Sequence, residues 1–356
     1  MPLAELAVDQ LRCVQHARMA IAPSISLIYG ENGSGKTSLL EAMFLLGRGR
    51  SFRTRSSERL IRLGEPQLTV FGRTQGELSH KLGVEVSRAE GVRARVDGGD
   101  LPSLAELSNL LPVQAIDPNI HKLVDEGSYG RRRWLDWAVF HVEPSFSRAW
   151  SRYQRALKQR NALLRRGLGH AGDSLDVWDI ELNSHAQPLT GARQRVMAGI
   201  MPFWQKLITT LLGHRVDISF HQGWAKDQDF GECLRSARAR DEQGGATSVG
   251  PQRADVVIRC DGKSARDVLS RGQQKLVAAA LILAQLQYLA ASAELHPTLL
   301  LDDPAAELDD YRLQQFIGAV QGLNTQLVIT SLRSDFAIFG QPERVFHVEQ
   351  GRVQEV

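Results

Sequence analysis

The stretch that begins at residue 28, IYGENGSGKTSLLEAMFLL, has the spacing of a phosphate-binding loop. Gly30 is followed by four residues and then by Gly35, Lys36 and Thr37, which fits the pattern G-x-x-x-x-G-K-[ST]. The apolar run SISLIYG before it predicts a strand, and the run TSLLEAMFLLG after it has the apolar spacing of a helix. The motif therefore lies between a strand and a helix, where phosphate binding requires it.

Each part of this loop has a defined use in holding ATP and Mg²⁺. Glycines allow backbone N–H groups to turn toward an anion, and a helix N-terminus adds partial positive charge. Lys36 is expected to reach the β- and γ-phosphates, and the hydroxyl of Thr37 is a ligand for Mg²⁺. A chance glycine-rich turn is the competing explanation, which the flanking strand and helix disfavour. The expected phosphate-binding residues are Gly30, Glu31, Asn32, Gly33, Ser34, Gly35, Lys36, Thr37 and Ser38.

A pair of carboxylates near the C-terminus predicts the other half of such a site. In HPTLLLDDPAAELDD, three leucines lead directly to Asp302 and Asp303, as in a buried parallel strand. Ligands bind beyond the carboxyl ends of parallel strands. We expect Asp302 to complete the Mg²⁺ shell and Asp303 to orient the attacking water or accept its proton. A strand followed by an acidic turn is the alternative, and the presence of the phosphate loop weakens it.

A third motif lies between these two and suggests a second phosphate-binding device. The segment DVLSRGQQKLVAAALILAQLQYLA places Ser270, Gly272 and Gln273 at the start of a strongly apolar helical pattern. One nucleotide does not easily use two helix N-termini from opposite sides of a monomer. The sequence therefore predicts a head-to-tail dimer in which each ATP lies between the phosphate loop of one subunit and the Ser270 loop of the other.

Composition sets the wider limits on structure and location. The chain has 356 residues, a length that predicts two structural units. Its formal net charge is +3, so the chain as a whole is not a polycation. The three cysteines, Cys13, Cys233 and Cys260, show no C-x-x-C spacing, so neither a zinc site nor a disulfide framework is expected. No signal peptide or membrane-spanning run is apparent, and a cytoplasmic location is predicted.

Basic residues are concentrated in two regions, although the chain is nearly neutral. Residues 131–166 contain ten Lys and Arg but two acidic residues, and a second group of arginines follows the phosphate-loop helix. Such local excess indicates an anionic partner such as the DNA backbone, although arginines on solvated helices are ordinary. The candidate DNA contacts are Arg50, Arg53, Arg55, Arg131, Arg132 and Arg133.

Together these motifs resemble the ABC-type ATPases and, more narrowly, the RecF family of bacterial recombination mediators. The closer resemblance is carried by YGENGSGKTSLLEAMFLLGRGRSFR, RRRWLDWAVFHVEPSF, SVGPQRAD, LSRGQQKL and DDPAAELD. It implies an SMC-like ATPase head that dimerises with ATP on double-stranded or gapped DNA near single-strand junctions. It also implies slow, DNA-stimulated ATP hydrolysis and cooperation with RecR and RecO in loading RecA.

The sequence departs from the family pattern at three places. Ser128 replaces a proline, no His follows the strand QLVIT to contact the γ-phosphate, and Asp303 stands where most ABC enzymes have Glu. A shorter acid holds water less well, which fits slow turnover. Gln114 is a weak candidate for the glutamine loop that links the two lobes of such enzymes, and an exposed loop residue is an equally good explanation.

The expected fold is α/β, a P-loop ABC-type ATPase head with a mixed sheet and a small antiparallel sheet. An inserted all-helical arm contains a short antiparallel coiled coil, indicated by Trp150, Leu157 and Leu164 at heptad spacing. The predicted boundaries are 1–112 for the N-terminal part of the head, 113–240 for the arm and 241–356 for the C-terminal part.

Two other functions are compatible with a phosphate loop. The nucleotide-binding subunit of a membrane transporter needs a membrane partner, and it keeps the phosphate loop and the signature motif closer together than the more than two hundred residues here. A structural clamp that never hydrolyses ATP is disfavoured by the pair Asp302–Asp303.

Overall fold

The computed structural model describes residues 2–76, 78–166, 172–213, 215–305, 309–334 and 338–356, and the side chains of residues 172–174 are not described. The chain forms two compact units. Unit 1 comprises Met1–Ile120 and Glu294–Val356, and unit 2 comprises His121–Ala293. The segment from 241 to 293, which was grouped with the head, therefore belongs to unit 2, because its helix packs among the helices of that unit.

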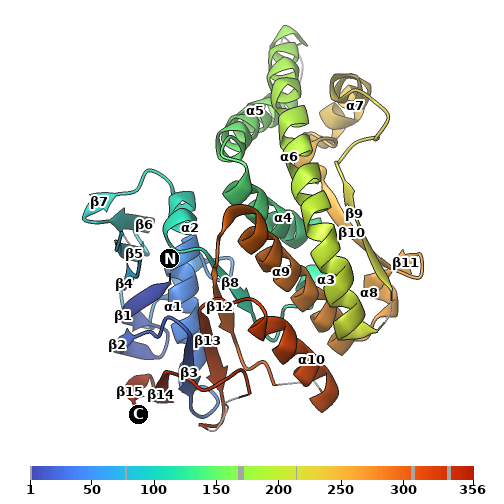
Figure 1. Cartoon of the computed structure of the whole chain (residues 1–356). Coiled ribbons are helices and arrows are strands. Elements are labelled where there is room, and N and C mark those ends of the chain that lie inside the picture. The colour runs from blue at the N-terminus through green and yellow to red at the C-terminus, as the bar shows by residue number, and fades with distance from the viewer. Residues whose placement is uncertain (1, 77, 167–171, 214, 306–308, 335–337) are drawn as a thin grey trace. The chain divides into compact units, whose positions relative to one another are not determined.

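Unit 1 is built from two sheets, with two helices and several short helical turns between their strands (Figure 1). An antiparallel sheet has the order β2-β1-β4-β5-β6-β7, and a mostly parallel sheet has the order β15-β14-β3-β13-β12-β8. The strands of the first sheet are β1 (Leu3–Leu11), β2 (Val14–Ala20), β4 (Gln67–Thr74), β5 (Lys81–Ser87), β6 (Gly91–Val96) and β7 (Gly99–Asp100). Those of the second are β3 (Ile25–Tyr29), β8 (Val113–Ile116), β12 (Thr298–Leu301), β13 (Leu327–Ser331), β14 (Arg344–Glu349) and β15 (Arg352–Glu355). The helical elements of unit 1 are α1 (Lys36–Arg48), η1 (Ser57–Leu60), η2 (Leu104–Glu106), α2 (Leu107–Leu110) and α10 (Asp310–Gln321).

The burial patterns explain why these segments form these two sheets. Every residue of β12 and of β13 is buried, as in strands covered on both faces of a parallel sheet. In β4 exposed or partly exposed residues alternate with buried ones, as in a sheet with one solvated face. The segments PQLTVFGRT, HKLGVEVSR and GVRARVDGG, in which apolar and polar residues alternate, contain β4, β5 and β6, and the small antiparallel sheet expected from the sequence is confirmed.

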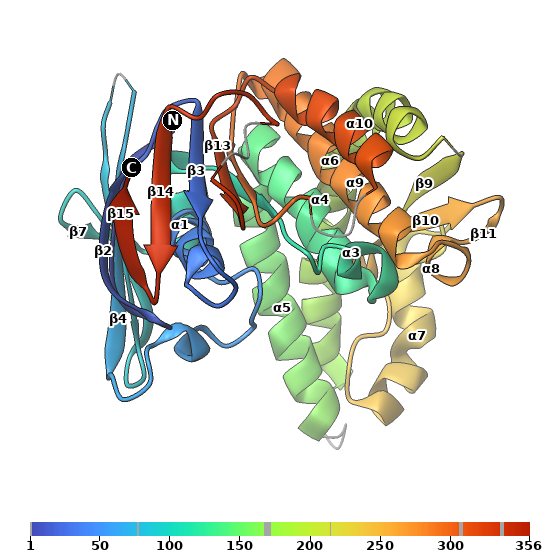
Figure 2. The same cartoon turned by 90° about the horizontal axis from the view of Figure 1, so that it is seen from below.

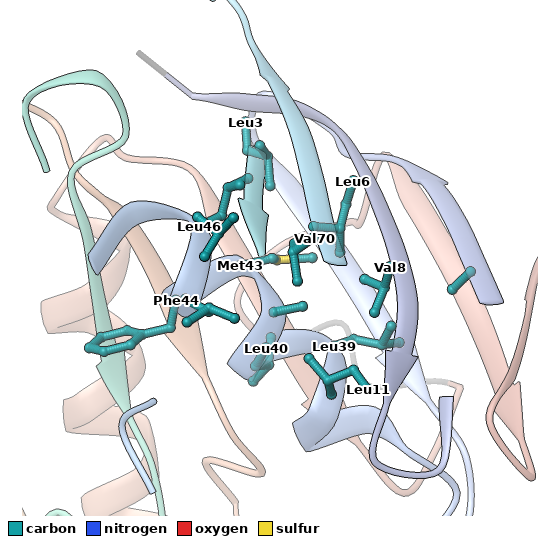
Figure 3. Packing of buried hydrophobic residues seen from close by; sticks show 14 of the residues in the cluster. Leu3, Leu6, Val8, Leu11, Leu39, Leu40, Met43, Phe44, Leu46 and Val70 are labelled. Atoms are coloured by element: carbon teal, nitrogen blue, oxygen red, sulfur yellow. The ribbon is translucent and has the colours of Figure 1, made fainter. Parts of the chain in front are cut away.

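Helix α1 lies between the two sheets and is buried on both sides (Figure 2). Figure 3 shows Leu39, Leu40, Met43 and Leu46 of α1 packed against leucines and valines of the antiparallel sheet. Because nearly every side chain of α1 is buried, the orientation of the helix is fixed by close packing rather than by its own helix propensity. The start of α1, which carries the phosphate loop, is therefore held in place by the core.

Unit 2 is mainly helical, with one small sheet of order β11-β10-β9. Its elements are α3 (Lys122–Asp125), α4 (Ser128–Val142), α5 (Phe146–Arg166), α6 (Gly172–Leu212), β9 (Val216–His221), α7 (Phe230–Gly244), η3 (Pro251–Arg253), β10 (Asp255–Cys260), β11 (Lys263–Ser264), α8 (Ala265–Val268) and α9 (Arg271–Ala293). The region expected to be wholly helical thus includes β9. The strand β10, which contains VVIRC, pairs with β9 and not with a strand of the head. The sequence does not predict this pairing, because an alternating pattern does not specify the partner strand.

The predicted pair of antiparallel helices is α5 and α6, which pack against each other. Tyr153, Leu157 and Leu164 of α5 are buried, and Trp150 is partly buried, so these residues form a packed seam. The turn predicted between the two helices falls mostly on residues 167–171 and lies outside the described residues. Helix α9 is long and apolar enough to cross a membrane by length and composition, but it is packed inside unit 2 against α4 and α6.

Candidate nucleotide-binding site

The phosphate loop follows β3 and ends at the first residue of α1, as the sequence predicted. Gly30 has φ of +154°, and a Cβ at this position would lie 2.2 Å from the carbonyl oxygen of Val348. No other residue fits there without moving the backbone of β14. Gly35 has φ of +120° and is the N-cap residue of α1. The N–H groups of the first turn of α1 are thus available to an anion.

Lys36 is buried and reaches back across the loop. Its Nζ donates hydrogen bonds to the carbonyl oxygens of Gly30, at 2.7 Å, and Glu31, at 2.8 Å. Burial lowers the pKa of Lys36 below its ordinary value, and the nearby carboxylates of Asp303 and Asp302 partly oppose that shift. The ammonium group is therefore held among neutral carbonyls in a position where phosphate oxygens would be stronger acceptors.

Thr37 and Asp302 meet at the mouth of the loop, although they are far apart in the sequence. The hydroxyl of Thr37 lies 2.9 Å from Oδ1 and 3.0 Å from Oδ2 of Asp302, to which it donates. A hydroxyl and a carboxylate are hard oxygen ligands of the kind that Mg²⁺ accepts alongside water and phosphate oxygens. These two residues fit the predicted magnesium site.

Thr330, at the carboxyl end of β13, holds both carboxylate residues and was not anticipated from the sequence. Its hydroxyl donates to Oδ1 of Asp302 at 2.9 Å and accepts the backbone N–H of Asp303 at 2.9 Å. The side chain of Thr330 is fully buried. Asp303 has a φ of +47°, which is unusual for a residue other than glycine. Thr330 thus fixes the orientation of Asp302 and the backbone of Asp303 together.

A pocket of about 400 Å³ in unit 1 brings these groups together. It also exposes Asp117 and Asn119, which follow β8, and these were missed because a single D-P-N sequence has no distinctive spacing. Burial, and then the charge of Asp302, raises the pKa of Asp117. Burial and Asp302 also raise the pKa of Asp303, while Lys36 opposes the shift. The lining residues are Cys13, Asn32, Gly33, Gly35, Lys36, Thr37, Ser38, Arg53, Asp117, Pro118, Asn119, Asp302 and Asp303.

The raised pKa values of Asp117 and Asp303 share two causes, burial first and then the negative charge of Asp302. Three aspartates line the pocket, whereas Lys36 is the cation that opposes the shift in Asp303 and Arg53 the cation that opposes it in Asp117. A divalent cation beside Thr37 would relieve this excess of negative charge. Gln114, the candidate for the lobe-linking loop, lies inside β8 opposite Leu299, is buried, and does not line the pocket.

Arg53 lies at the pocket because the segment after α1 is attached to the buried carboxylate of Glu41. Ser51 donates to Glu41 at 2.5 Å, and its Oγ accepts the backbone N–H of Arg53 at 2.9 Å. Arg12 adds an ion pair with Glu41 at 2.7 Å. Arg53 was predicted as a DNA contact, but its position suits a nucleotide phosphate better. Arg50 and Arg55 lie in the same segment and are partly exposed and exposed, respectively.

The third motif of the sequence, LSRGQ with Ser270, Gly272 and Gln273, is the signature motif of the ABC-type pattern. It lies in unit 2, at the start of α9. The hydroxyl of Ser270 accepts the N–H of Gln273 at 3.3 Å, and Oε1 of Gln273 accepts the N–H of Ser270 at 2.9 Å. These two reciprocal bonds form a capping box. Ser270 is exposed, and Gly272 and Gln273 are partly exposed. The motif therefore begins a well-defined helix and is open to solvent.

The three consecutive arginines of α4 are engaged within unit 2. Arg131 forms a two-bonded ion pair with Asp255, at 2.8 and 3.0 Å, and is largely buried. Arg132 donates to the carbonyl oxygen of Ala254 at 2.7 Å. Arg133 lies over the ring of Tyr129, and burial lowers its pKa. Arg131 and Arg132 are better explained as residues that hold α4 against the start of β10 than as DNA contacts.

Replacing Thr330 with Val should weaken Mg²⁺ binding by about 10- to 100-fold, the usual cost of losing a group that orients a metal ligand. The reason is that Asp302 loses the donor that orients it and the N–H of Asp303 is left unsatisfied. The measurement is Mg²⁺ titration of nucleotide binding, together with the melting temperature without nucleotide.

Thr330→Ser retains the hydroxyl and should restore Mg²⁺ affinity. Thr298→Val is the matched control, because Thr298 is a buried threonine at the opposite end of β12, bonded to Gln326 at 2.7 Å. Equal effects of Thr330→Val and Thr298→Val on Mg²⁺ affinity would show that Thr330 acts on stability alone.

The chain is similar to known proteins over nearly its whole length. The family model for the RecF/RecN/SMC N-terminal domain matches residues 2–354. The DNA replication and repair protein RecF of Pseudomonas putida (strain GB-1) is 39% identical over 100% of this chain and 98% of its own length. The RecF protein of Shewanella baltica (strain OS155 / ATCC BAA-1091) is 37% identical over 99% of both chains.

Solved structures show the same relationship. The recombination mediator protein RecF-ATP of the RecFOR pathway has a TM-score of 0.90 and 25% identity, with 100% of this chain and 97% of that chain covered. An Smc head bound to the C-terminal winged-helix domain of ScpA has a TM-score of 0.61 at 15% identity, covering 100% of this chain and 97% of its own, which indicates a shared fold. The transporter-subunit alternative has no support in these full-length matches. With its phosphate loop, paired aspartates and full-length relatives, the chain belongs to the RecF family of ATP-binding recombination mediators, within the wider RecF/RecN/SMC group.

Proposed function

We propose that this protein is an ATP-dependent DNA-repair protein whose ATP-bound form is a head-to-tail dimer on duplex DNA. In this scheme it acts near single-strand/double-strand junctions and cooperates with RecR and RecO in loading RecA at gaps, in the cytoplasm. The observation that carries the proposal is the pocket of unit 1, where the phosphate loop, Thr37 and the pair Asp302–Asp303 converge. Family membership and the likeness to RecF-ATP support it.

The pocket residues divide the work of ATP hydrolysis between them. Lys36 and the loop N–H groups hold the phosphates, and Thr37 and Asp302 hold Mg²⁺. Mg²⁺, when bound, neutralises charge on the phosphate oxygens. Asp303 accepts a hydrogen bond from the attacking water, and Thr330 keeps Asp303 in position. Arg53 adds a positive charge at the pocket wall.

Turnover is proposed to be slow and to be stimulated by DNA. Asp303 is shorter than the glutamate usual at this place in ABC enzymes, so it orients water less well. Hydrolysis would then act as a timer that opens the dimer and releases DNA. Ser270, which is exposed, and Gly272, which is partly exposed, lie at the start of α9 and are proposed to contact the γ-phosphate of the ATP held by the partner subunit.

Ser270→Arg tests the shared site. With ATP, Mg²⁺ and a short duplex, the unmodified protein should change from monomer to dimer in light scattering, and Ser270→Arg should remain monomeric. A large cation at the exposed end of α9 would fill the space proposed for the partner's phosphates, whereas ATP binding by the monomer should be unchanged. A Ser270→Arg variant that still dimerises with ATP would contradict the proposal.

Ser292→Arg is the matched control for this substitution. Ser292 is an exposed serine near the other end of α9. Ser292→Arg therefore adds the same positive charge to the same helix as Ser270→Arg. It should dimerise like the unmodified protein. Loss of dimerisation in both variants would indicate a general effect on α9.

A further inference from the structure

The exposed face of α5 is an unusually basic surface of unit 2. This 21-residue helix contains no acidic residue. Its exposed cations, spaced three, four or seven residues apart with one adjacent pair at the end, are Arg148, Arg152, Arg155, Lys158, Arg165 and Arg166. From Arg148 to Arg166 the helix spans about 27 Å, roughly the length of eight base pairs of duplex DNA.

A hollow of about 730 Å³ lies along this helix and is lined by cations and amides. Arg155, Lys158 and Arg165 supply three positive charges to its wall. The remaining lining residues in the described part of the chain are Gln154, Leu157, Gln159 and Asn161, which include no carboxylate and no aromatic ring. A concave wall with cations and amide donors suits phosphate oxygens, and without aromatic rings it offers nothing for base stacking.

These cations differ from most other arginines of the same unit in having no local partner. Arg131, Arg193 and Arg238 are each paired with aspartates of unit 2. Within the described part of the chain, the six exposed cations of α5 form no ion pair or hydrogen bond. Their charge is therefore uncompensated, which concentrates positive potential along one helix.

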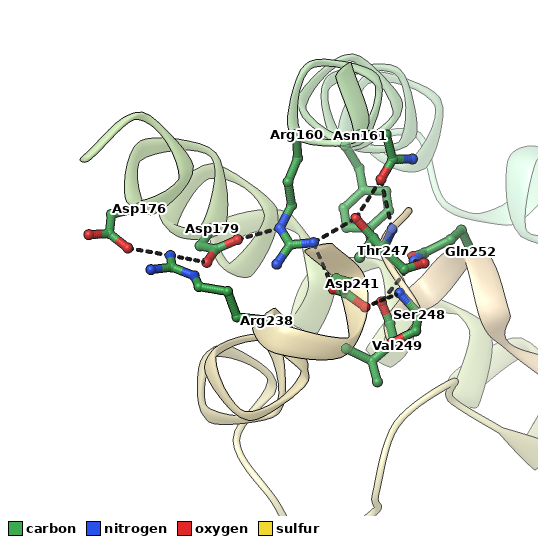
Figure 4. A network of polar contacts seen from close by, with 11 residues as sticks. Arg160, Asn161, Asp176, Asp179, Arg238, Asp241, Thr247, Ser248, Val249 and Gln252 are labelled. Carbon is green, nitrogen blue, oxygen red and sulfur yellow. Dashed lines mark hydrogen bonds and ion pairs between the residues drawn. The ribbon is translucent and has the colours of Figure 1, made fainter. Parts of the chain in front are cut away.

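The opposite side of α5 is held by a buried polar network (Figure 4). Arg160, whose side chain is fully buried, donates to Asp179 of α6 at 2.6 Å and to Asp241 of α7 at 2.8 Å. It also donates to Thr247 at 2.9 Å, and Asn161 accepts from the backbone N–H of the same threonine. Because these bonds connect three helices and a loop, the basic face of α5 is presented by a rigid support.

We infer that the basic face of α5 binds the phosphate backbone of duplex nucleic acid without reading its sequence. This inference rests on the proposed function and locates its DNA-binding surface on α5 rather than on Arg131 and Arg132. Contacts of this kind give salt-dependent affinity that is nearly the same for any sequence. The distinctive observation is a charged hollow on a rigid helix, whose described lining residues are cations, amides and one leucine.

The test is fluorescence anisotropy of a labelled duplex with the full-length protein, ATP and Mg²⁺, over a range of salt concentrations. The variant carries Arg155→Gln, Lys158→Gln and Arg165→Gln together. The logarithm of the affinity falls with the logarithm of the salt concentration. Loss of three phosphate contacts should make this slope less steep by about 2.7, near 0.9 for each contact. Affinity at ~0.1 M salt should fall by about tenfold or more, equally for unrelated sequences.

The control variant removes the same three charges elsewhere in unit 2, with Lys206→Gln, Lys226→Gln and Arg235→Gln, all exposed. It should bind DNA like the unmodified protein, which excludes a general effect of net charge. Melting temperature and ATP turnover without DNA should be unchanged in both variants, because none of the six residues lines the nucleotide pocket.

Two outcomes separate this inference from the proposed function. If the unmodified protein binds no duplex under any condition, the proposed function fails. If it binds duplex and the α5 variant binds equally well with the same salt slope, the inference alone is overturned. Loss of binding to an acidic protein partner, with DNA binding intact, would likewise overturn it and assign the surface to that partner.

Discussion

ATP turnover should fall by roughly 100-fold or more when Asp303 is replaced by Asn, since a positioned general base contributes about 10²- to 10⁴-fold. The amide keeps the size of the side chain, and the backbone N–H of residue 303 can still donate its hydrogen bond to the hydroxyl of Thr330. It removes the carboxylate that would orient or deprotonate water. ATP binding and dimerisation should persist, so the variant should accumulate as an ATP-bound dimer that is slow to leave DNA.

The same variant should be more stable than the unmodified protein without nucleotide. Burial and Asp302 raise the pKa of Asp303, so the ionised side chain opposes folding at neutral pH. For a carboxyl with a raised pKa, stability is lost as pH rises from the unfolded value through the folded one, and the amide abolishes that loss. Single-turnover kinetics and melting curves at several pH values provide the measurements. Turnover unchanged in Asp303→Asn would show that Asp303 is not the base.

ATP binding should weaken by about 10- to 100-fold when Lys36 is replaced by Met, in line with the loss of one or two charge-assisted hydrogen bonds. The ammonium group is held by the carbonyls of Gly30 and Glu31, which are weak partners compared with phosphate oxygens. Methionine fills a similar volume, so the loop should remain folded. The loss therefore measures the electrostatic contribution of Lys36 to binding.

Calorimetric titration with a slowly hydrolysed ATP analogue measures this loss directly. Lys81→Met is a suitable control, because Lys81 is an exposed lysine at the start of β5 in the same unit. Removing Lys36 should also raise the pKa of Asp303 further, since Lys36 opposes that shift. Equal nucleotide affinity in Lys36→Met and in the unmodified protein would contradict the assignment of Lys36 to the phosphates.

The phosphate loop and the paired aspartates were predictable because their chemistry requires fixed spacing. A loop that turns around phosphate needs glycines at set positions, and a metal ligand at the end of a buried strand follows an unbroken apolar run. Thr330 and Asp117 carry no such signal. Each is one polar residue at the end of a strand, and its role depends on sheet order, which brings β8, β12 and β13 side by side.

The arginines of α4 and α5 could not be assigned from the sequence, because a contact with a distant partner leaves no mark in the local pattern. Arg131, Arg132 and Arg133 form a cluster in the sequence. In the structure, however, Arg131 forms an ion pair with Asp255, and Arg132 donates a hydrogen bond to the carbonyl of Ala254. A run of cations does not reveal which of them have partners, because the partners lie more than a hundred residues later. In the sequence the cations of α5 belong to the basic region 131–166, for which an anionic partner and ordinary solvation are equally good explanations. The hollow beside them, and their lack of partners among the described residues, can be seen only in the folded structure.

The central position of β3 has a consequence for the newly made chain on the ribosome. β3 pairs on one side with β13 and on the other with β14, both close to the C-terminal end of the sequence. At about 5–20 residues per second, roughly 15–60 seconds separate the synthesis of β3 from that of its partners. Throughout this time an apolar strand has both edges unpaired, and Asp302, the proposed Mg²⁺ ligand, is made only near the end of it. The mostly parallel sheet of unit 1 must therefore assemble late, and β3, the first strand of that sheet to be made, is an exposed apolar segment that chaperones would protect.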